Sequence, residues 1–181
     1  YNYLFAKHHK GDFLLRIEDT DQNRYVPGAE DYILKSLAWL GISPDEGIGV
    51  GGPHGPYRQS ERKDTYAPYG EQLVKNGWAY YAFDTPEELN EVRELAIKAG
   101  VSSWQYNSIT RNSMKNSLTL PSDEVEKKLA NNEPYVIRFK MPRGEEIRFE
   151  DEIRGWINVN TDQLDDKVLM KNDGMPTYHL A

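Results

Sequence analysis

Three carboxylates stand close together near the front of the sequence, in the run Glu18-Asp19-Thr20-Asp21. Arg16 and Arg24 flank this run. The residues before it have the alternating pattern of a strand with one buried face, carried by Phe13, Leu15 and Ile17. Arg16 and Glu18 share the other face of that strand. Since ligands of α/β proteins bind at the carboxyl ends of strands, the acidic run is a candidate binding site.

Two other interpretations of the acidic run remain. Charged residues are mostly surface residues, so the run could equally be a solvated turn after a half-buried strand. The spacing of Asp19, Asp21 and Asn23, with Glu30 at the twelfth position, also resembles a calcium-binding loop. Such a loop needs Gly at its sixth position, where this sequence has Arg24, and it needs helical flanks. We therefore do not expect a calcium site.

Composition limits the classes of protein to consider. Of the 181 residues, 38% are hydrophobic and 28% are charged, as in an ordinary globular protein. No apolar run approaches membrane length and the sequence does not open on a signal peptide, so we expect a cytoplasmic protein without a membrane partner. Without Cys there can be no thiolate zinc site. The four His show no ligand spacing, so neither zinc nor another metal site is expected.

The charge balance bears on nucleic-acid binding. The net charge is −7, from 22 Lys and Arg against 29 Asp and Glu. A general nucleic-acid-binding surface would be basic, so composition argues mildly against RNA and gives no reason to expect DNA. A local RNA contact surface is compatible with this charge, because RNA recognition can be confined to a groove and a few stacked bases.

The first half of the sequence predicts an α/β arrangement. The expected elements are a helix over 2–10, a strand ending near Ile17, helices over 29–40 and 60–76, and an aromatic strand over 78–83. A strand followed by a helix indicates one βα unit of a parallel, doubly wound sheet. The Gly-rich loop 44–56 lacks a phosphate-loop pattern, so we expect it to position residues 57–60. Ser60 is the expected cap of the helix that follows.

The second half predicts two helices and several short antiparallel strands. Thr85 and Glu88 form a capping-box pattern at the start of a helix that ends near Gly100. Residues 101–121 are poorly patterned, and we expect a boundary of mobile loop and short turn there. The other expected elements are a short helix capped by Ser122, strands over 135–141, 147–149, 156–159 and 167–170, and a helix starting at Pro176. This layout is typical of an inserted α+β domain.

Basic side chains provide candidate RNA contacts. Arg138, Lys140, Arg143 and Arg148 form the densest basic patch, and Arg138 and Lys140 share one face of their predicted strand. That face is either the solvated side of a sheet or a surface for the phosphates of an RNA end. Arg58 and Arg62, four residues apart near a helix start, leave the same two alternatives open.

Four stretches, in order, resemble the class I glutamyl-tRNA synthetases. They are Leu-Arg-Ile-Glu-Asp-Thr-Asp at 15–21 with Arg-Tyr and Pro-Gly at 24–28, Gly-Gly-Pro-His-Gly-Pro-Tyr-Arg-Gln-Ser-Glu-Arg at 51–62, Gly-Trp-Ala-Tyr-Tyr at 77–81, and Asp-Gly with Pro-Thr-Tyr-His-Leu-Ala at 173–181. The resemblance spreads over nearly the whole chain and is weakest in its middle third.

The resemblance implies an organisation in three segments. A partial Rossmann-like class I catalytic core, truncated at its front, is expected over 1–83, and the chain returns to this core over 171–181. An inserted α+β domain that binds the acceptor stem is expected over 84–170. The His-x-Gly-His motif that holds ATP and the Lys-rich catalytic loop are missing from these residues. We therefore expect an internal fragment that, alone, neither activates glutamate nor charges tRNA.

The resemblance also implies roles for individual residues. Glu18 matches the residue that receives the ammonium of L-glutamate, and Tyr178 matches one that lines the same pocket. Asp21 and Arg24 fall near where the 3′ end of tRNA approaches. With these two, the possible tRNA contacts are Asp21, Arg24, Arg58, Arg138 and Lys140. No catalytic residue is expected within the chain.

The activity implied by the resemblance is that of a glutamate–tRNA ligase. Such an enzyme uses ATP with Mg²⁺ to activate L-glutamate and transfers it to the 3′ end of tRNA(Glu). One alternative is the paralogue that glutamylates queuosine in tRNA(Asp), although that family has a Cys-based zinc site and a less extended insertion. The other alternative is a non-catalytic module that binds the tRNA acceptor.

Overall fold

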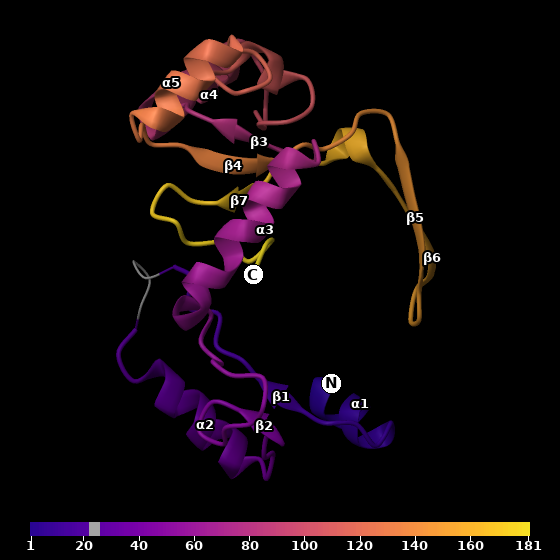
Figure 1. The fold of residues 1–181 in the computed structure, drawn as a ribbon. Helices are drawn as coiled ribbons and strands as arrows, with labels where there is room; N and C mark the ends of the chain where they lie inside the picture. The colour runs from indigo at the N-terminus through magenta and orange to yellow at the C-terminus, as the bar shows by residue number, and fades with distance from the viewer. Residues whose placement is uncertain (22–25) are drawn as a thin grey trace. The chain divides into compact units, whose positions relative to one another are not determined.

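The computed structural model describes residues 1–21 and 26–181, and its ribbon is shown in Figure 1. The chain divides into two compact units, residues 1–66 with Ala181 and residues 67–180, which we call unit 1 and unit 2. The boundary lies inside helix α3 (Lys63–Lys75). A parallel strand pair lies in unit 1, and the antiparallel sheets lie in unit 2.

Unit 1 contains a strand–helix–strand arrangement with parallel strands. Helix α1 (Asn2–His8) precedes strand β1 (Leu14–Leu15), and helix α2 (Ala29–Trp39) leads to strand β2 (Glu46–Gly47). Leu14 pairs with Glu46, and Leu15 pairs with Gly47, in parallel register. A further parallel bridge joins Ile17 to Arg58. The parallel βα unit expected from the sequence is therefore confirmed.

The pairing of β1 with β2 requires glycine at position 47. Gly47 has φ +138°, and a Cβ built there would lie 2.3 Å from the carbonyl oxygen of Leu15. We expect Gly47→Ala to lower the free energy of unfolding by more than the ~1–2 kcal/mol that a left-handed backbone alone costs. The reason is that the added Cβ would clash with backbone atoms of Leu15 on the partner strand, which cannot move aside as a flexible side chain can. Gly51→Ala is the control, since Gly51 has φ +87° and no heavy atom within 4 Å of the added Cβ. Equal melting temperatures of the two variants would contradict this expectation.

Unit 2 is built around a three-stranded antiparallel sheet. Its strands are β3 (Ala79–Ala82), β4 (Val136–Phe139) and β7 (Val168–Met170), in the order β3-β4-β7. Helices α4 (Pro86–Lys98) and α5 (Ser122–Ala130) lie together on one side of it (Figure 1). Because β3 pairs with β4, a strand of the predicted segment 1–83 shares a sheet with the segment 84–170. The three-segment division stays a prediction that rests on the resemblance.

Of the two helix caps predicted in unit 2, one is confirmed and the other was wrong. The capping box of α4 is confirmed, since the Thr85 hydroxyl accepts from the Glu88 backbone N–H and the Glu88 carboxylate accepts from the Thr85 backbone N–H. The prediction that Ser122 caps α5 was wrong. Ser122 is the first helical residue, Pro121 occupies the cap position, and no side chain bonds to the helix start there.

The segment 101–121, expected to be mobile loop and short turn, contains turns and the short 3₁₀ helix Thr110–Ser113, and part of it is buried. Tyr106 and Met114 from this segment form the core with Tyr80 and Ala82. Asn116 is fully buried, and its side-chain amide donates to the carbonyls of nearby residues while its Oδ1 accepts the Leu118 backbone N–H at 3.0 Å. In this segment, hydrogen bonds from side chains satisfy backbone groups that a helix or sheet would otherwise satisfy. The segment therefore has no helical or strand periodicity in its sequence from which a defined structure could be predicted.

The end of the chain does not form the helix predicted from Pro176. Pro176 is fully buried and forms a β-bridge with Met170. The Thr177 N–H donates to the carbonyl of Leu169 at 2.8 Å, and residues 178–180 form a turn. The backbone of residues 176 and 177 is thus held beside β7, which prevents a helix from starting at this proline.

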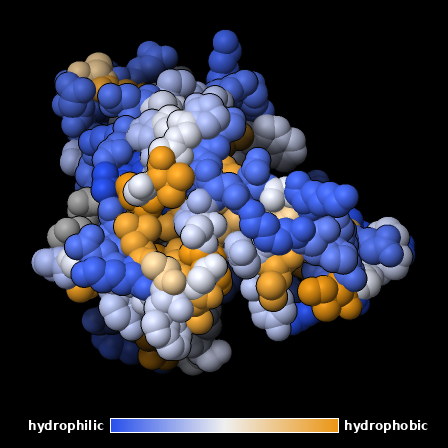
Figure 2. All heavy atoms as spheres, turned by 90° about the horizontal axis from the view of Figure 1, so that it is seen from below, coloured by the Kyte–Doolittle hydropathy of each residue, from blue (hydrophilic) through white to orange (hydrophobic). Residues whose placement is uncertain are grey.

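A hairpin of strands β5 (Glu146–Asp151) and β6 (Gly155–Asn160) extends from unit 2 (Figure 1). Exposed hydrophobic side chains occur on this hairpin and on α2, and Figure 2 shows that such residues reach the surface among hydrophilic ones. Within the described residues, no helix is both long enough and apolar enough to cross a membrane.

Candidate functional site

Glu18 lies just beyond the paired part of the first strand. Its side chain is 59% exposed, and the guanidinium of Arg16 contacts it with 3.4 Å between Nη2 and Oε1. This ion pair is long and exposed, so it contributes at most about 1 kcal/mol to stability and leaves the carboxylate accessible. The expectation that Arg16 and Glu18 share one face is consistent with this contact.

Glu18 borders two pockets of unit 1. The first has a volume of about 640 Å³ and is also lined by Asp21, Glu30 and Arg58. The second has a volume of about 520 Å³ and is also lined by Arg16, His54, Tyr57 and Arg62. The structure therefore brings the predicted residues Glu18, Asp21 and Arg58 together. Arg24, the other predicted tRNA contact near this site, lies outside the described residues.

Arg58 is held by two carboxylates from neighbouring elements. Its Nε and Nη2 donate to the two oxygens of Glu30 at 2.9 and 2.7 Å, and its Nη1 donates to Glu61 at 2.8 Å. These contacts raise the pKa of Arg58, and the hydrogen bond from Arg58 lowers the pKa of Glu30. Through these hydrogen bonds to Glu30 and Glu61, the guanidinium of Arg58 links α2 to the start of the next helix. A contact between Arg58 and tRNA stays a prediction.

Ser60 does not cap the helix as the sequence predicted. Its backbone N–H and its hydroxyl both donate to Asp19, at 2.8 and 2.5 Å. The carboxylate of Asp19 therefore receives one N–H group, that of Ser60, in the first turn of the 3₁₀ helix Gln59–Arg62, a role usually taken by a residue adjacent in sequence. The pairing of Ile17 with Arg58 makes this possible, because it places the end of the first strand beside the helix start.

Glu46 organises the Gly-rich loop. Its side chain is 11% exposed and accepts from the Tyr57 hydroxyl at 2.6 Å, from the His54 backbone N–H at 2.9 Å, and contacts His54 Nδ1 at 2.9 Å. After the loop, Ile17 N–H donates to the Tyr57 carbonyl and Gln59 N–H donates to the Ile17 carbonyl. The loop positions residues 57–59 as expected, but the sequence analysis missed Glu46, whose only signal is a carboxylate directly before the glycines.

The pKa of Glu46 is lowered, first by the hydrogen bond from Tyr57 and then by its contacts with His54. A carboxyl group whose pKa falls on folding stabilises the fold above its unfolded pKa of about 4.3, and this contribution is lost as the pH falls through the folded pKa. We expect Tyr57→Phe to speed amide exchange in residues 46–60 at pH 7, with a difference from wild type that shrinks below pH 4.

Hydrogen exchange between pH 3 and 7, corrected for the intrinsic rates, measures this difference. Tyr32→Phe is the control, because Tyr32 is 73% exposed on α2. A Tyr57→Phe difference that stays constant with pH would show that Glu46 is not the group involved.

Tyr178, the second predicted glutamate-binding residue, lies in unit 2. It is 67% exposed, and its ring lies 3.9 Å from the ring of His179, centroid to centroid. It follows Thr177, whose backbone N–H donates a hydrogen bond to the carbonyl of Leu169. Its side chain is accessible to a ligand.

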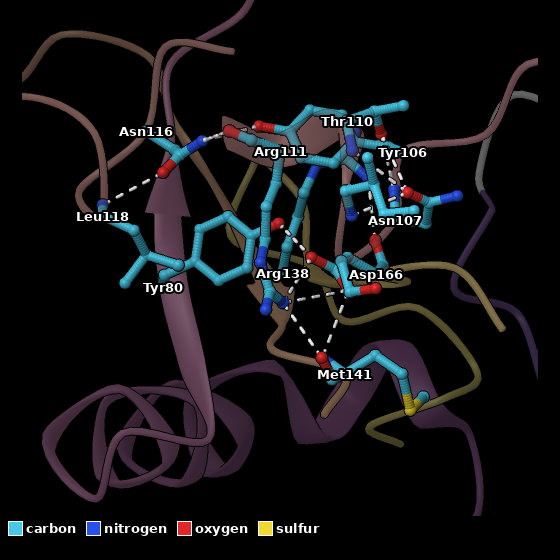
Figure 3. A network of polar contacts seen from close by, with 12 residues as sticks. Tyr80, Tyr106, Asn107, Thr110, Arg111, Asn116, Leu118, Arg138, Met141 and Asp166 are labelled. Atoms are coloured by element: carbon cyan, nitrogen blue, oxygen red, sulfur yellow. Dashed lines mark hydrogen bonds and ion pairs between the residues drawn. The ribbon is translucent and has the colours of Figure 1, made fainter. Parts of the chain in front are cut away.

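Arg138 is part of a buried polar network in unit 2 (Figure 3). Its Nη1 donates to the backbone carbonyl of Asp166 at 2.9 Å, and its guanidinium lies 4.0 Å from the centre of the Tyr106 ring. Lys140 lies one residue beyond β4, is half-buried, and donates its backbone N–H to Trp78. Their contacts with tRNA stay predictions, and the structure shows an internal packing role for Arg138.

The centre of this network is Asp166, which the sequence analysis did not single out. Its carboxylate is fully buried and accepts from the Tyr80 hydroxyl at 2.6 Å, from Arg111 Nη1 at 3.1 Å, and from the Met141 backbone N–H at 3.1 Å. Burial and the hydrogen bond to Asp166 raise the pKa of Tyr80. Asp166 therefore joins β3, the segment 101–121 and the end of β4. Nothing in the local sequence separates it from its partly exposed neighbour Asp165.

Within residues 1–21 and 26–181, no three His, Asp or Glu side chains gather in a way that could hold a metal ion. The chemistry available in unit 1 is that of charge complementarity, with an accessible carboxylate at Glu18 and cationic groups beside it. A parallel βα unit with charged groups at its strand end is the arrangement at which α/β proteins commonly bind ligands.

The chain belongs to the tRNA synthetases class I (E and Q), catalytic domain, whose family model matches residues 1–181. It is 65% identical to the glutamate–tRNA ligase of Amoebophilus asiaticus and 62% identical to that of Cytophaga hutchinsonii, in each case over 100% of this chain and 35% of the relative. The chain thus spans about a third of the length of these curated relatives. The expected resemblance is confirmed.

Solved structures agree with this assignment. The crystal structure of a glutamate tRNA ligase from Elizabethkingia meningosepticum, in complex with its amino acid, matches with a TM-score of 0.96 and 58% identity over 99% of this chain and 36% of that one. The glutamate-tRNA synthetase of Elizabethkingia anophelis matches equally well. The mixed α/β fold is therefore shared with these structures.

Proposed function

We propose that the protein is a cytoplasmic glutamate–tRNA ligase, which activates L-glutamate with ATP and transfers it to the 3′ end of tRNA(Glu). The observation that carries this proposal is Glu18, an accessible carboxylate at a strand end in a chain that is 65% identical to such a ligase. An α-ammonium needs an anionic partner, and Glu18 provides one beside pockets of about 640 and 520 Å³.

Most of the catalysis of such a reaction consists of positioning and electrostatic stabilisation. Glu18 binds and orients the amino acid in this proposal, and Tyr178 lines the same site. ATP is the co-substrate, and Mg²⁺ enters with the phosphates that it commonly binds. The His-x-Gly-His motif and the Lys-rich loop implied by the resemblance are not among these 181 residues, so we propose that the chain alone is inactive.

We further propose that residues 84–170 form an inserted domain for the acceptor stem of tRNA. The side chains open to an RNA phosphate include the exposed Arg143 and Arg148, and Lys140 is half-buried. The guanidinium of Arg148 lies 4.4 Å from the centre of the Trp156 ring on the hairpin β5–β6. Arg138 supports this surface from inside, through its contacts with Asp166 and Tyr106.

The test is glutamate-dependent ATP–pyrophosphate exchange by the full-length protein, with and without tRNA, followed by charging of tRNA(Glu) and tRNA(Asp). Exchange with glutamate and charging of tRNA(Glu) are expected, and the 181-residue chain should give neither. Transfer to tRNA(Asp) instead would favour the queuosine-modifying paralogue. Binding of an acceptor-stem RNA without any glutamate activation would favour the non-catalytic module.

A further inference from the structure

The hairpin of β5 and β6 has one apolar face and one polar face. Ile147 pairs with Val159 and Phe149 pairs with Ile157, and because side chains alternate along a strand, these four lie on the same face. The opposite face consists of Glu146, Arg148, Glu150, Trp156, Asn158 and Asn160. Such an alternation is typical of an antiparallel sheet that buries one of its faces.

Within residues 1–21 and 26–181, the apolar face is not buried. Ile147 and Phe149 are 44% and 46% exposed, and Ile157 and Val159 are half-buried. Among these residues no third strand extends the hairpin, and in Figure 1 it stands away from the helices and the three-stranded sheet of unit 2. Two adjacent cross-strand pairs form a continuous apolar patch, which is the mark of a contact surface.

Hydrogen bonds hold the hairpin at both of its ends. At the turn, Oδ1 of Asp151 accepts the backbone N–H groups of Ile153 and Arg154 at 2.9 and 2.7 Å. At the base, the hydroxyl of the buried Thr161 accepts the backbone N–H of Glu145 at 3.0 Å. A two-stranded hairpin alone is only marginally stable in water. A hairpin fixed in this way presents its apolar face in one conformation, which lowers the entropic cost of a contact.

The apolar face fits protein better than RNA. None of its four side chains has a polar atom, whereas RNA presents phosphates and 2′-hydroxyls. A second copy of the chain is also a poor fit, because a specific interface between two chains buries roughly 1,000 Å² or more, and four side chains cannot provide this area. A contact within one molecule needs less area, since its formation costs no translational freedom.

The full-length protein contains the residues that such a contact requires. About two thirds of each curated relative lies outside the part that matches this chain. The solved structure with a TM-score of 0.96 matches 99% of this chain but only 36% of its own, so the fold that includes the hairpin occurs within a much longer molecule.

We propose that the apolar face of the β5–β6 hairpin packs against a part of the full-length protein that lies outside residues 1–181. The contact would fix the hairpin to the remainder of the molecule, while its polar face stays open to solvent. This inference rests on the family and on the length of its members. Failure of the activity proposed above would therefore leave it standing.

The first experiment is photo-cross-linking of the full-length protein after the substitution Phe149→p-benzoylphenylalanine. Trp156→p-benzoylphenylalanine is the matched control, because Trp156 is an aromatic residue on the opposite face of the same hairpin and is 59% exposed. The Phe149 variant should form cross-links within one molecule to peptides outside residues 1–181, identified by mass spectrometry, and the control should form several-fold fewer. Cross-links between two molecules, cross-links only to residues 1–181, or equal yields in both variants would overturn the inference.

The second experiment measures amide exchange in full-length wild type, Phe149→Thr and Trp156→Thr. Threonine keeps a high strand propensity, so each variant loses mainly the aromatic ring. Phe149→Thr should speed exchange by about 10-fold or more in residues 146–160 and in the segment that cross-links to position 149. Trp156→Thr should leave that second segment unchanged, and both variants should keep wild-type exchange in β3. Unchanged exchange of the second segment in Phe149→Thr would overturn the inference.

Discussion

Replacement of Glu18 by Gln is expected to reduce kcat/KM for glutamate in ATP–pyrophosphate exchange by about 10- to 100-fold in the full-length protein. The side chain keeps its size and one acceptor oxygen but loses the charge that pairs with the ammonium. A hydrogen bond to a charged group contributes about 1.5–3 kcal/mol, which corresponds to that range. Because Glu18 is 59% exposed and its 3.4 Å pair with Arg16 lies at the surface, the substitution should leave stability almost unchanged.

The matched control for Glu18 is Asp31→Asn. Asp31 lines the pocket of about 640 Å³ together with Glu18 and lies on α2. The Asp31→Asn substitution therefore removes one negative charge from the same region without removing the proposed ammonium contact. Equal losses in the two variants would mean that the general field of the pocket, and not a contact with Glu18, attracts glutamate. Full activity of Glu18→Gln would remove Glu18 from the site.

Replacement of Asp166 by Ala is expected to destabilise unit 2 by about 3–5 kcal/mol. The substitution leaves the guanidinium of Arg111, which is 12% exposed, without its buried counter-charge, and it removes the acceptor of the Tyr80 hydroxyl and the Met141 backbone N–H. Removing one partner of a buried pair costs this much because the remaining charge stays desolvated. Urea unfolding and amide exchange at Met141 measure the effect.

Asp165→Asn is the control for this experiment. Asp165 is adjacent to Asp166, but its 3D environment differs, since it forms an ion pair with Lys167 in which the two side chains are 29% and 48% exposed. Such a pair contributes less than about 1 kcal/mol. If the Asp166→Ala variant were as stable as Asp165→Asn, the network of Figure 3 would not hold unit 2 together. Under the proposed function, Asp166→Ala should also weaken tRNA binding more than glutamate binding.

The local sequence was sufficient to predict features that depend on neighbouring residues. The βα unit, the helices α2 and α4, and the capping box at Thr85 were all predicted, because alternation, helical spacing and capping act within a few residues. Glu18 and its shared face with Arg16 also came from the strand pattern. The resemblance that led to the family was carried by short contiguous motifs.

Only the tertiary structure showed which polar side chains pair with one another. Arg58 and Arg62 are indistinguishable in sequence, yet one is bound by Glu30 and Glu61 and the other lines the Glu18 pocket. Ser60 was predicted to cap its own helix, but Asp19, 41 positions earlier, binds it. Asp166 and the order of residues 101–121 depend on partners far away in the chain. A hydrogen bond requires its donor and acceptor to lie close together in space. The sequence indicates such closeness only for residues near one another in the chain. Pairings between distant residues are therefore decided by the tertiary fold.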